Sequence, residues 1–439
     1  MKMSSSVNLN PKTPRVQIKT PKDAFSQELF QFCLENPITV VEGLCSPSVC
    51  DFKLGKFSTL SLTKAWPDHP IEIRTQKFKS AEKNVPMAGR NSWDCYSARS
   101  QMTIRKYGEY QGANFLREKN GVGGNSAHGI QFGTNLDLSD AKMWQLQLQE
   151  FNKLPPAFKL YSPGNLLSYV GHNILGMNTV QLYMKVKGSR TPGHEENNKF
   201  CAVNINVGPG DCEWFGVADE YWPAMYKLCQ SHGMNYLKGS WWPDPEECFA
   251  AGIPVYRFIQ RPGDLVYINI GCVHWVQSLG VTNNIAWNVG PLVPLQFRAA
   301  LERYDFNKVE NYKSIVPMIL LSWNIGRTLW IRDPEFFQLV KKVLSNSLDK
   351  SRKDLQQARR HNVPIRHHGK KEGEPVHYCG SCEEEVFNTL FIKKNEKRPR
   401  VFCLECALQS SPQLEDYACL QEYTLDELTT VYENFKRLE

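Results

Sequence analysis

The sequence lacks the features that would indicate a membrane protein, a secreted protein or a repeat architecture. It contains no run of about 18 apolar residues, so we do not expect a membrane-spanning helix. The first twenty residues contain no apolar stretch of the kind found in a secretory signal, and no fixed-period repeat is visible. Hydrophobic residues make up 41% and charged residues 22%, which is typical of a globular protein with two or three packed units.

Cysteine and charge bound the environment and the partners. The fourteen cysteines are expected to lie in a reducing compartment, where cysteine pairs more often bind metal or pack than form disulfides. Residues 201–300 contain five Lys and Arg against eight Asp and Glu, a balance of −3, whereas residues 1–200 contain 25 against 16, a balance of +9. This split fits a basic ligand near the middle of the chain and a basic surface for DNA elsewhere, although ordinary solvated charge explains it equally well.

The segments before residue 178 predict short elements. Residues 1–20 are polar with two prolines and predict a flexible arm. Residues 21–33 show helical spacing of apolar side chains, residues 40–41 predict a short strand, and residues 139–153 predict a helix with Ser139 as its N-cap. We therefore expect a mixed helical region over residues 21–135 that packs on the core.

The stretch from residue 178 to residue 293 is rich in β-forming residues. Strands are predicted at residues 179–186, 201–207, 254–260, 265–270, 272–277 and 284–289. Several short strands at near-regular spacing indicate an antiparallel sandwich or barrel.

After residue 297 the pattern becomes helical, and a small cysteine-rich unit begins near residue 379. Helices are predicted at residues 299–304, 314–323, 334–350, 353–360 and 425–438. We therefore expect three further parts: a β-rich domain over residues 136–300, a helical linker over 301–370, and a C-terminal unit over 371–439 that ends in a helix.

His194, Glu196 and His274 are the candidate iron ligands. Two neutral imidazoles and one carboxylate form the facial triad that suits non-heme Fe(II) and leaves coordination positions open. Residues i and i+2 of a strand point to the same side, so His194 and Glu196 can converge, and His274 must come from a partner strand. The spacing alone is a weak signal, because an isolated histidine is more often an ordinary polar residue, but the β-rich context favours iron. Glu195 is expected on the opposite face.

Lys185, Thr191 and Asn204 are the candidate contacts for 2-oxoglutarate, the co-substrate that such an oxygenase requires. An inward cation beside a hydroxyl and an amide suits a carboxylate. Judged by residue type alone, Lys185 is slightly better explained as an exposed residue of the alternating segment 184–187. Both interpretations remain open at this point.

Two CxxC pairs separated by twenty residues predict a structural zinc site held by Cys379, Cys382, Cys403 and Cys406. The signal is strong, because redox pairs or core cysteines fit two tight pairs in a short polar segment poorly. A unit this small has too little core to fold without the metal. The remaining cysteines are expected to be small buried residues: Cys33, Cys45, Cys50, Cys95, Cys201, Cys212, Cys229, Cys248, Cys272 and Cys419.

With these residues placed, the sequence resembles the UTX-type Jumonji demethylases that act on lysine 27 of histone H3. The matching stretches include residues 201–214, 254–264 and 283–291, and the resemblance runs from about residue 14 to the C-terminus. It includes the helical linker and the zinc unit, which distinguish this subfamily from other Jumonji proteins. The resemblance implies a mainly β catalytic core of the JmjC type, a double-stranded β-helix or jelly roll, over residues 136–300.

The resemblance also implies roles for individual residues. The matching contacts are His194, Glu196 and His274 for iron, and Lys185, Thr191 and Asn204 for 2-oxoglutarate. This reverses the preference stated above for Lys185. Tyr183 matches a residue of the methyl-lysine pocket, and the four cysteines match zinc ligands of a unit that reads the histone tail. Ala202 is a departure, since we expect serine there, and the lost hydroxyl could weaken cofactor or substrate contacts by about 0.5–1.5 kcal/mol.

The implied function is removal of methyl groups from tri- or dimethylated lysine 27 of histone H3, by N-methyl hydroxylation with release of formaldehyde and succinate. The implied cofactors are Fe(II), 2-oxoglutarate and a structural Zn(II). The implied partners are the histone H3 tail and the nucleosome, with DNA on the basic surface, in the nucleus and without a membrane. Two rival functions stay open: a JmjC protein hydroxylase, or a chromatin-binding module of low activity, for which Ala202 leaves room.

Overall fold

The structure is a computed structural model that describes residues 8–77, 93–121, 129–394, 396 and 400–439. Contacts divide the chain into two units, Met1–Ser162 with Leu175–Val289, called unit 1, and Pro163–Ile174 with Gly290–Glu439, called unit 2. Among the described residues, no helix combines the length and the apolar character needed to cross a bilayer.

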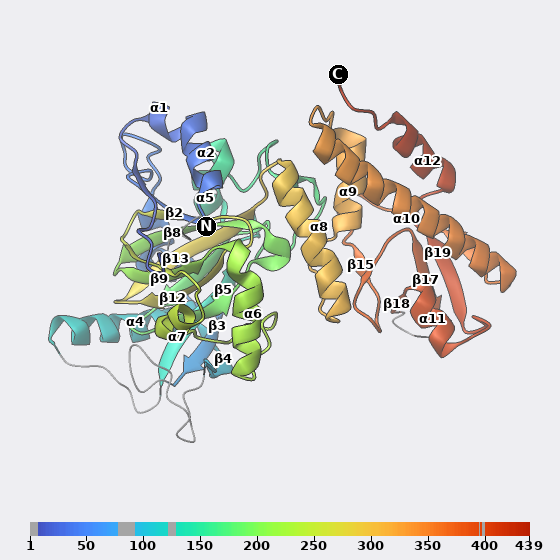
Figure 1. Cartoon of the computed structure of the whole chain (residues 1–439). Helices are drawn as coiled ribbons and strands as arrows, with labels where there is room; N and C mark the ends of the chain where they lie inside the picture. Colours follow the sequence, from blue (N-terminus) through green and yellow to red (C-terminus); the bar gives the residue numbers. More distant parts are fainter. Residues whose placement is uncertain (1–7, 78–92, 122–128, 395, 397–399) are drawn as a thin grey trace. The chain divides into compact units, whose positions relative to one another are not determined.

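Unit 1 is built on two β-sheets (Figure 1). The larger has the strand order β1-β2-β11-β8-β13-β6-β5-β3-β4, and the smaller has the order β10-β9-β12-β7. The strands of the larger sheet are β1 (Arg15–Gln17), β2 (Ile38–Glu42), β3 (Pro70–Gln76), β4 (Ser97–Thr103), β5 (Ile130–Asp137), β6 (Gln181–Lys185), β8 (Cys201–Pro209), β11 (Leu265–Ile268) and β13 (Thr282–Val289). Those of the smaller sheet are β7 (Arg190–His194), β9 (Cys212–Val217), β10 (Tyr256–Gln260) and β12 (Val273–Ser278).

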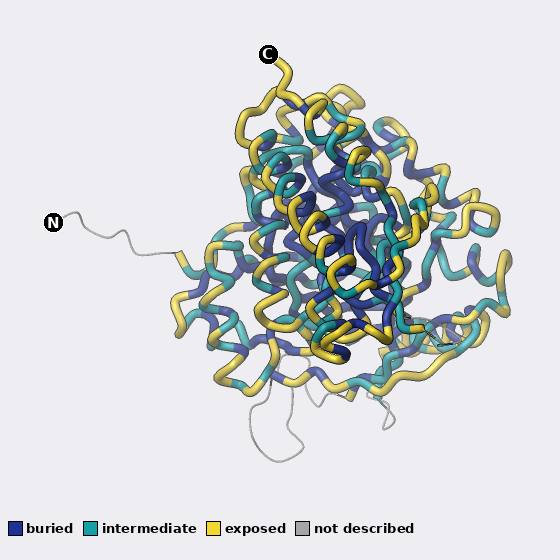
Figure 2. Tube along the Cα trace, turned by 90° about the vertical axis from the view of Figure 1, so that its right-hand side faces the viewer, coloured by how far each residue is buried: buried dark blue, intermediate teal, exposed yellow. Residues whose placement is uncertain are grey.

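Apolar side chains fill the space between the two sheets. Val40 and Val266 of the larger sheet share one buried cluster with Trp214 and Phe258 of the smaller sheet. Because side chains alternate along a strand, one face of each sheet is turned toward the other sheet, as in a β-sandwich. The tube coloured by burial shows buried, dark blue stretches of the chain in the interior and exposed, yellow stretches toward the outside (Figure 2). The prediction of a mainly β core is confirmed, and the strands expected between residues 179 and 289 are all present.

Strand β7 lies at the edge of the smaller sheet and pairs on one side with β12. Its other side is covered by groups that do not form a strand beside it. The side-chain amide of Gln76 exchanges two hydrogen bonds with the backbone of Arg190, at 2.9 and 2.7 Å. The N–H of Gly193 donates to the carbonyl of Trp241 at 2.6 Å.

The N-terminal part of the chain contributes more strand than predicted. The expectation of a flexible arm over residues 1–20 does not hold for residues 8–20: β1 pairs in parallel with β2, and Ile18 is buried. Residues 1–7 of the expected arm lie outside the described residues. The region expected to be mixed and helical over residues 21–135 supplies strands β2, β3, β4 and part of β5, which belong to the larger sheet.

Two predicted helices of unit 1 differ in the structure. The one expected over residues 21–33 is split into α1 and α2, because Ser26 takes an extended conformation and caps the N-terminus of α2. Ser139 is not an N-cap. The Asp140 carboxylate accepts hydrogen bonds from the backbone N–H groups of Lys142 and Met143, and this local turn competes with a helix until residue 145.

The helices of unit 1 surround the two sheets. The α-helices are α1 (Pro21–Ala24), α2 (Gln27–Glu35), α3 (Thr59–Ala65), α4 (Ile104–Lys119), α5 (Gln145–Leu148), α6 (Trp222–Ser231) and α7 (Pro245–Ala250). The 3-10 helices are η1 (Leu54–Phe57), η2 (Gln149–Lys153), η3 (Pro156–Phe158), η5 (Asn197–Lys199) and η6 (Asp219–Tyr221).

Unit 2 combines a helical part with a small β-rich part. The helices are η4 (Leu166–Tyr169), α8 (Pro294–Val309), α9 (Met318–Thr328), α10 (Pro334–Arg360), α11 (Leu404–Ser410) and α12 (Leu425–Asn434). The strands are β14 (Ile365–His367), β15 (His377–Tyr378), β16 (Glu385–Val386), β17 (Thr389–Lys393), β18 (Val401–Phe402) and β19 (Tyr417–Gln421). The two helices predicted over residues 334–350 and 353–360 form the single helix α10. Its buried positions, among them Leu344, Leu348 and Leu355, keep helical spacing throughout.

Candidate functional site

The three predicted iron ligands converge at one end of strands β7 and β12 of the smaller sheet: His194, Glu196 and His274. His194 is the last residue of β7, and it lies opposite His274 of the neighbouring strand β12. Glu196 follows in an extended conformation just beyond the strand, so its side chain returns to the side of His194. The Nε2 atoms of His194 and His274 lie 3.6 and 3.5 Å from Oε1 of Glu196. The predicted convergence of two imidazoles and a carboxylate is therefore present in the geometry.

The hydrogen bonds of both imidazoles turn their Nε2 lone pairs toward this centre. Nδ1 of His194 lies 2.8 Å from the carbonyl oxygen of Pro192, and Nδ1 of His274 lies 3.1 Å from that of Cys272. A carbonyl can only accept, so each Nδ1 carries the proton and each Nε2 is free to bind a metal. The donor set and its orientation fit a divalent ion such as Fe(II).

The charges of the three groups also suit a cation. Burial and the nearby His194 lower the pKa of His274 to about 4, so this ring is neutral at pH 7. Burial acts to raise the pKa of Glu196, but the interactions with His194, His274 and Asn288 together outweigh it and hold the pKa at about 2. Burial acts to lower the pKa of His194, but its contact with Glu196 raises it. A metal ion at this centre would compete with the proton that Glu196 favours on His194.

Gly193 and Glu195 lie next to the candidate ligands in the sequence, but their contacts are made away from the candidate metal centre. A Cβ atom at Gly193 would lie 2.1 Å from the ring of Trp241, so only glycine allows this close packing next to His194. Glu195 accepts a hydrogen bond from the hydroxyl of Tyr236 at 2.7 Å. The expectation that Glu195 points away from the ligand set agrees with this contact.

Asn288 is a site residue that the sequence analysis missed. Its side-chain amide donates to Oε2 of Glu196 at 2.9 Å and to the carbonyl of Cys201 at 3.1 Å. This leaves Oε1 of Glu196 facing the two histidines, so Asn288 orients the carboxylate for binding through one oxygen. The sequence alone did not single it out, because strand β13 contains two further buried asparagines, Asn283 and Asn284.

The Asn288→Ala variant is expected to bind Fe(II) about 10–100-fold more weakly, since partners that hold a metal ligand have effects of this size. Titration of the metal-free protein with Fe(II) under anaerobic conditions measures the dissociation constant. Asn269→Ala is the matched control, because Asn269 is also a buried asparagine but hydrogen-bonds to the backbone of Leu34 and Asn36. Equal weakening in both variants would show that the effect on metal binding comes from general destabilisation.

One face of the larger sheet carries the predicted cofactor and substrate contacts. Cross-strand partners lie on the same face of a sheet, and so do residues i and i+2 of a strand. The register pairs Tyr183 with Asn284 and Lys185 with Thr282 between β6 and β13, and it pairs Asn204 with Ala286 and Ala202 with Asn288 between β8 and β13. Because Asn288 contacts Glu196, this shared face is the one turned toward the metal ligands. We call it the inner wall.

Lys185 is buried on the inner wall rather than exposed. Its ammonium group lies 5.7 Å from the ring centroid of Phe132 and 5.9 Å from that of Tyr183, and within the described part of the chain no carboxylate forms an ion pair with it. Burial lowers the pKa of Lys185. A buried cation of this kind calls for an anionic ligand, which is what the 2-oxoglutarate interpretation requires.

The other predicted contact residues differ in their hydrogen bonds and in their exposure: Asn204, Thr191 and Tyr183. Oδ1 of Asn204 accepts hydrogen bonds from Gln260 at 3.2 Å and from Asn284 at 3.0 Å, so its amide group is fixed. Thr191 lies three residues before His194 on β7, opposite Val276, and is partly exposed. The hydroxyl of Tyr183 donates to Gln181 at 2.8 Å, and burial raises the pKa of Tyr183.

The four predicted zinc ligands come together in unit 2. One sulfur atom from each of Cys379, Cys382, Cys403 and Cys406 lies within 4.8 Å of the others, as four thiolates around one ion require. Cys379 follows β15, and Cys403 caps α11 by accepting from the backbone N–H of Cys406. Burial acts to raise the pKa of Cys379, but hydrogen bonds from the backbone N–H groups of Cys382 and Cys403 lower it to about 7, which favours the thiolate.

The ten other cysteines are all buried, as expected. Burial raises the pKa of Cys33 and Cys229 to about 12, which keeps their thiols protonated and unreactive. These cysteines therefore act as packing residues.

Three family profiles match the chain in the order that its architecture follows. A JmjC domain of the hydroxylase type matches residues 181–289, the C-terminal helical domain of lysine-specific demethylase 6/UTY matches residues 296–351, and a GATA-like domain of the same demethylase family matches residues 368–425. The first covers the candidate metal ligands His194, Glu196 and His274 and the inner wall, and the third covers the four cysteines.

Curated relatives agree with these matches. Lysine-specific demethylase 6B of Homo sapiens is 48% identical over 97% of this chain, and lysine-specific demethylase jmjd-3.1 of Caenorhabditis elegans is 31% identical over 85%. Lysine-specific demethylase REF6 of Arabidopsis thaliana is 26% identical over 39%. The chain spans only 28% and 38% of the length of the first two relatives. Because three profiles match in succession and the identity to lysine-specific demethylase 6B extends over 97% of this chain, the chain belongs to the lysine-specific demethylase 6 family of JmjC proteins.

Proposed function

We propose that this chain is an Fe(II)- and 2-oxoglutarate-dependent demethylase that acts on tri- or dimethylated lysine 27 of histone H3. The observation that carries the proposal is the convergence of two imidazoles and one carboxylate beside a wall with a buried lysine. Names of relatives that describe lysine-specific demethylases support the reaction class. The lysine-27 specificity rests on the family resemblance.

In this proposal each residue of the site has a separate task. His194, Glu196 and His274 hold the iron on one side and leave the other side open. Lys185 binds the far carboxylate of 2-oxoglutarate as a charge-assisted pair, assisted by Thr191 and Asn204. Bound iron and 2-oxoglutarate would supply the chemistry that activates O2. One oxygen atom converts 2-oxoglutarate to succinate and CO2, the other hydroxylates an N-methyl group, and the resulting carbinolamine releases formaldehyde.

Tyr183 is proposed to form one side of the methyl-lysine pocket. A methylated ammonium group has few or no N–H donors, so it is best held by aromatic faces and oxygen atoms. The ring of Tyr183 lies on the inner wall, and the negative charge of Glu196 acts on its hydroxyl, which indicates that both groups border one space. The ring packs near Phe132, with centroids 6.1 Å apart, so its position is fixed.

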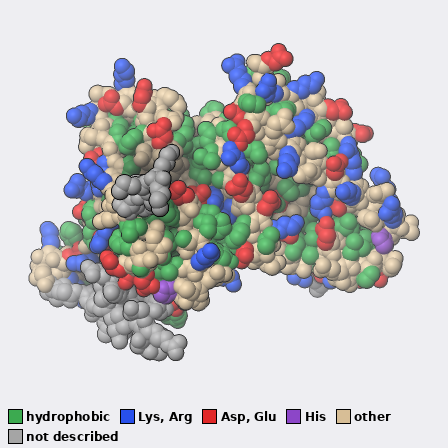
Figure 3. Space-filling model, viewed as in Figure 1, with side chains coloured by type: hydrophobic (Ala, Val, Ile, Leu, Met, Phe, Trp, Pro, Cys, Tyr) green, Lys and Arg blue, Asp and Glu red, His purple; other side chains and the backbone are tan. Residues whose placement is uncertain are grey.

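The zinc-bearing part of unit 2 is proposed to contact the histone tail on the N-terminal side of the target lysine, in the nucleus and on nucleosomes. Four thiolates around zinc would give this small part its rigidity. On the face drawn in Figure 3, acidic and basic side chains are interspersed rather than collected in one area. Contact with DNA through a basic surface therefore remains a proposal that rests on the net charge of +7.

The test is an assay of the iron-loaded protein on histone H3 peptides methylated at lysine 4, 9, 27 or 36. Mass spectrometry is expected to show loss of one methylene unit per methyl group from the lysine-27 peptide, with formaldehyde released in equal amount. Gain of one oxygen atom without loss of a methylene unit would instead identify a protein hydroxylase. Peptide binding without any turnover would identify a chromatin-binding module, and turnover confined to another lysine would refute the proposed substrate.

The Ala202→Ser variant tests the departure from the family pattern. Ala202 is buried on the inner wall opposite Asn288, so a hydroxyl there would point toward the ligand space. We expect the KM for 2-oxoglutarate or for the peptide to fall by about 2–10-fold, which corresponds to one hydrogen bond of about 0.5–1.5 kcal/mol. Steady-state kinetics measure the change. Ala299→Ser in α8 is the control with similar burial, and an equal effect there would exclude a local role for position 202.

A further inference from the structure

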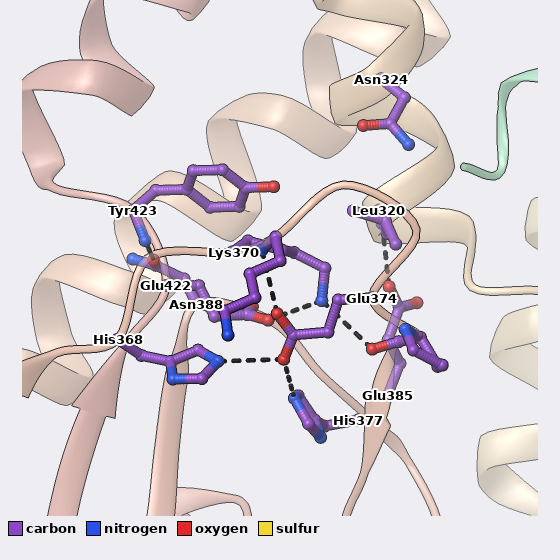
Figure 4. Close-up of polar contacts among 12 residues, drawn as sticks. Leu320, Asn324, His368, Lys370, Glu374, His377, Glu385, Asn388, Glu422 and Tyr423 are labelled. Carbon is purple, nitrogen blue, oxygen red and sulfur yellow. Dashed lines mark hydrogen bonds and ion pairs between the residues drawn. The ribbon is translucent and has the colours of Figure 1, made fainter. Parts of the chain in front are cut away.

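Unit 2 contains a second group of side chains that could hold a metal ion. His377 on β15 and Glu374 in the loop before it face Glu422, which follows β19 (Figure 4). One ligand atom from each of the three lies within 4.8 Å of the others. His368, after β14, also turns its ring toward Glu374. We call these four residues the second cluster.

The donor atoms of the second cluster are spaced as ligands of one ion would be. Nε2 of His368 lies 2.9 Å and Nε2 of His377 lies 3.3 Å from Oε1 of Glu374. With metal–ligand bonds of about 2.0–2.1 Å, neighbouring donors are separated by about 2.9 Å in an octahedron and about 3.4 Å in a tetrahedron. The corresponding nitrogen–oxygen distances in the His194–Glu196–His274 group, 3.5 and 3.6 Å, are of similar size. Two imidazoles and two carboxylates suit a borderline divalent ion.

The carboxylates of the second cluster are ready to bind a cation. Burial acts to raise the pKa of Glu374, but hydrogen bonds from the backbone N–H of Lys371 and from His368 lower it to about 2, so the group is ionised. The side chain of Glu422 is only 3% exposed, and its Oε2 accepts a hydrogen bond from the backbone N–H of Asn388 at 3.0 Å. Its other oxygen, Oε1, faces a cation that is already part of the chain.

That cation is the ammonium group of Lys370, which lies 2.7 Å from Oε1 of Glu422 and is 6% exposed. It also donates to the carbonyl of Pro375 at 3.3 Å. Lys370 lines a cavity of about 420 Å³, together with Asn324, Arg327 and Tyr423, so its flexible side chain has space to move away from Glu422. A lysine and a divalent ion are alternative partners for the same carboxylate, because both cannot approach Oε1 closely.

We propose that Glu374, His377 and Glu422, with His368 as a fourth ligand, form a second metal site of unit 2 for a borderline divalent ion such as Zn²⁺ or Co²⁺. Lys370 occupies the carboxylate of Glu422 when no metal is bound and moves aside when it binds. The ion joins the segment of residues 368–377 to the end of β19. This segment ends two residues before Cys379, the first cysteine of the zinc site. This site is independent of the proposed oxygenase reaction.

The experiment measures how many Co²⁺ ions the full-length chain binds while zinc occupies its four cysteines. Equilibrium dialysis followed by elemental analysis is expected to give two Co²⁺ per wild-type chain, one at His194, Glu196 and His274 and one at the second cluster. The Glu374→Gln and His377→Gln variants are expected to bind one. The matched control is His367→Gln, an exposed histidine of the same segment, which is expected to bind two.

Lys370→Met gives a test that does not depend on losing a function. Removing the competing ammonium group is expected to lower the dissociation constant for the second Co²⁺ by about tenfold or more. Retention of one zinc per chain in every variant shows that unit 2 remains folded. One Co²⁺ per wild-type chain that is retained in the Glu374→Gln variant, two in the Glu374→Gln variant, or no gain of affinity in the Lys370→Met variant would each overturn the proposal and leave a hydrogen-bonded network.

Discussion

The His194→Ala variant is expected to lose more than about a hundredfold in turnover of a histone H3 peptide trimethylated at lysine 27. Loss of a group that only orients a metal ligand lowers metal affinity or activity by about 10–100-fold, and loss of the ligand itself must exceed this. His194 supplies one of only two imidazoles in the group, and its Nε2 lies 3.6 Å from Oε1 of Glu196. Formaldehyde release at saturating Fe(II) and 2-oxoglutarate measures the effect.

The control for this variant is Glu195→Gln. Glu195 is the direct neighbour of the ligand Glu196, but its carboxylate contacts the hydroxyl of Tyr236. Its replacement is expected to leave Fe(II) affinity within about threefold of wild type, because the amide retains an oxygen that accepts from Tyr236. Unchanged formaldehyde release by His194→Ala would refute the assignment of the metal centre, and with it the proposed reaction.

The Cys403→Ser variant is expected to lose its zinc and to unfold the C-terminal part of unit 2. Binding of structural zinc contributes on the order of 10 kcal/mol to the folding free energy of small units. This part of the chain has few other interactions that could replace that contribution. Its apolar cluster includes Cys379 beside residues such as Phe391 and Tyr417, so loss of the metal disrupts the core directly. Zinc content should fall from one ion per chain to none, and limited proteolysis should cut within residues 377–425.

Cys419→Ser is the matched control for the zinc site. Cys419 is a buried cysteine in the same apolar cluster, but it lies outside the group of four sulfur atoms. Its replacement should lower stability modestly through burial of a hydroxyl while zinc remains bound at one ion per chain. Retention of zinc and of protease resistance by Cys403→Ser would contradict a four-cysteine site.

The sequence alone predicted the parts of the fold in which one physical signal is dominant. Residues 201–207 alternate strictly and form β8, and the apolar pattern of residues 265–268 gives β11. The convergence of His194, Glu196 and His274 was also predictable, because residues i and i+2 of an extended segment share a side and the β-rich context offered a partner strand for the distant histidine. The four cysteines needed only their spacing.

Other parts of the structure depend on contacts that no local pattern reports. Strand β4 is largely exposed, and its sequence, Ser97–Thr103, is polar, so it is a strand only because β3 pairs with it. Asn288 resembles any polar strand residue until Glu196 is known to lie opposite it. The break after α1 and the turn at Asp140 each depend on one side-chain hydrogen bond that competes with the helix.

The position of β7 at the edge of the smaller sheet has a consequence for the metal-free protein. Strand β7 has a ladder on one side only and is held on its other side by the hydrogen bonds with Gln76 and Trp241, so its opening requires fewer broken hydrogen bonds than that of a strand with two ladders. His194 is carried by this strand and His274 by the inner strand β12. An ion that binds both histidines would link the edge strand to the inner strand, so iron would stabilise the position of β7 in addition to its chemical role. Amide exchange along residues 190–194 should therefore slow when the metal is added.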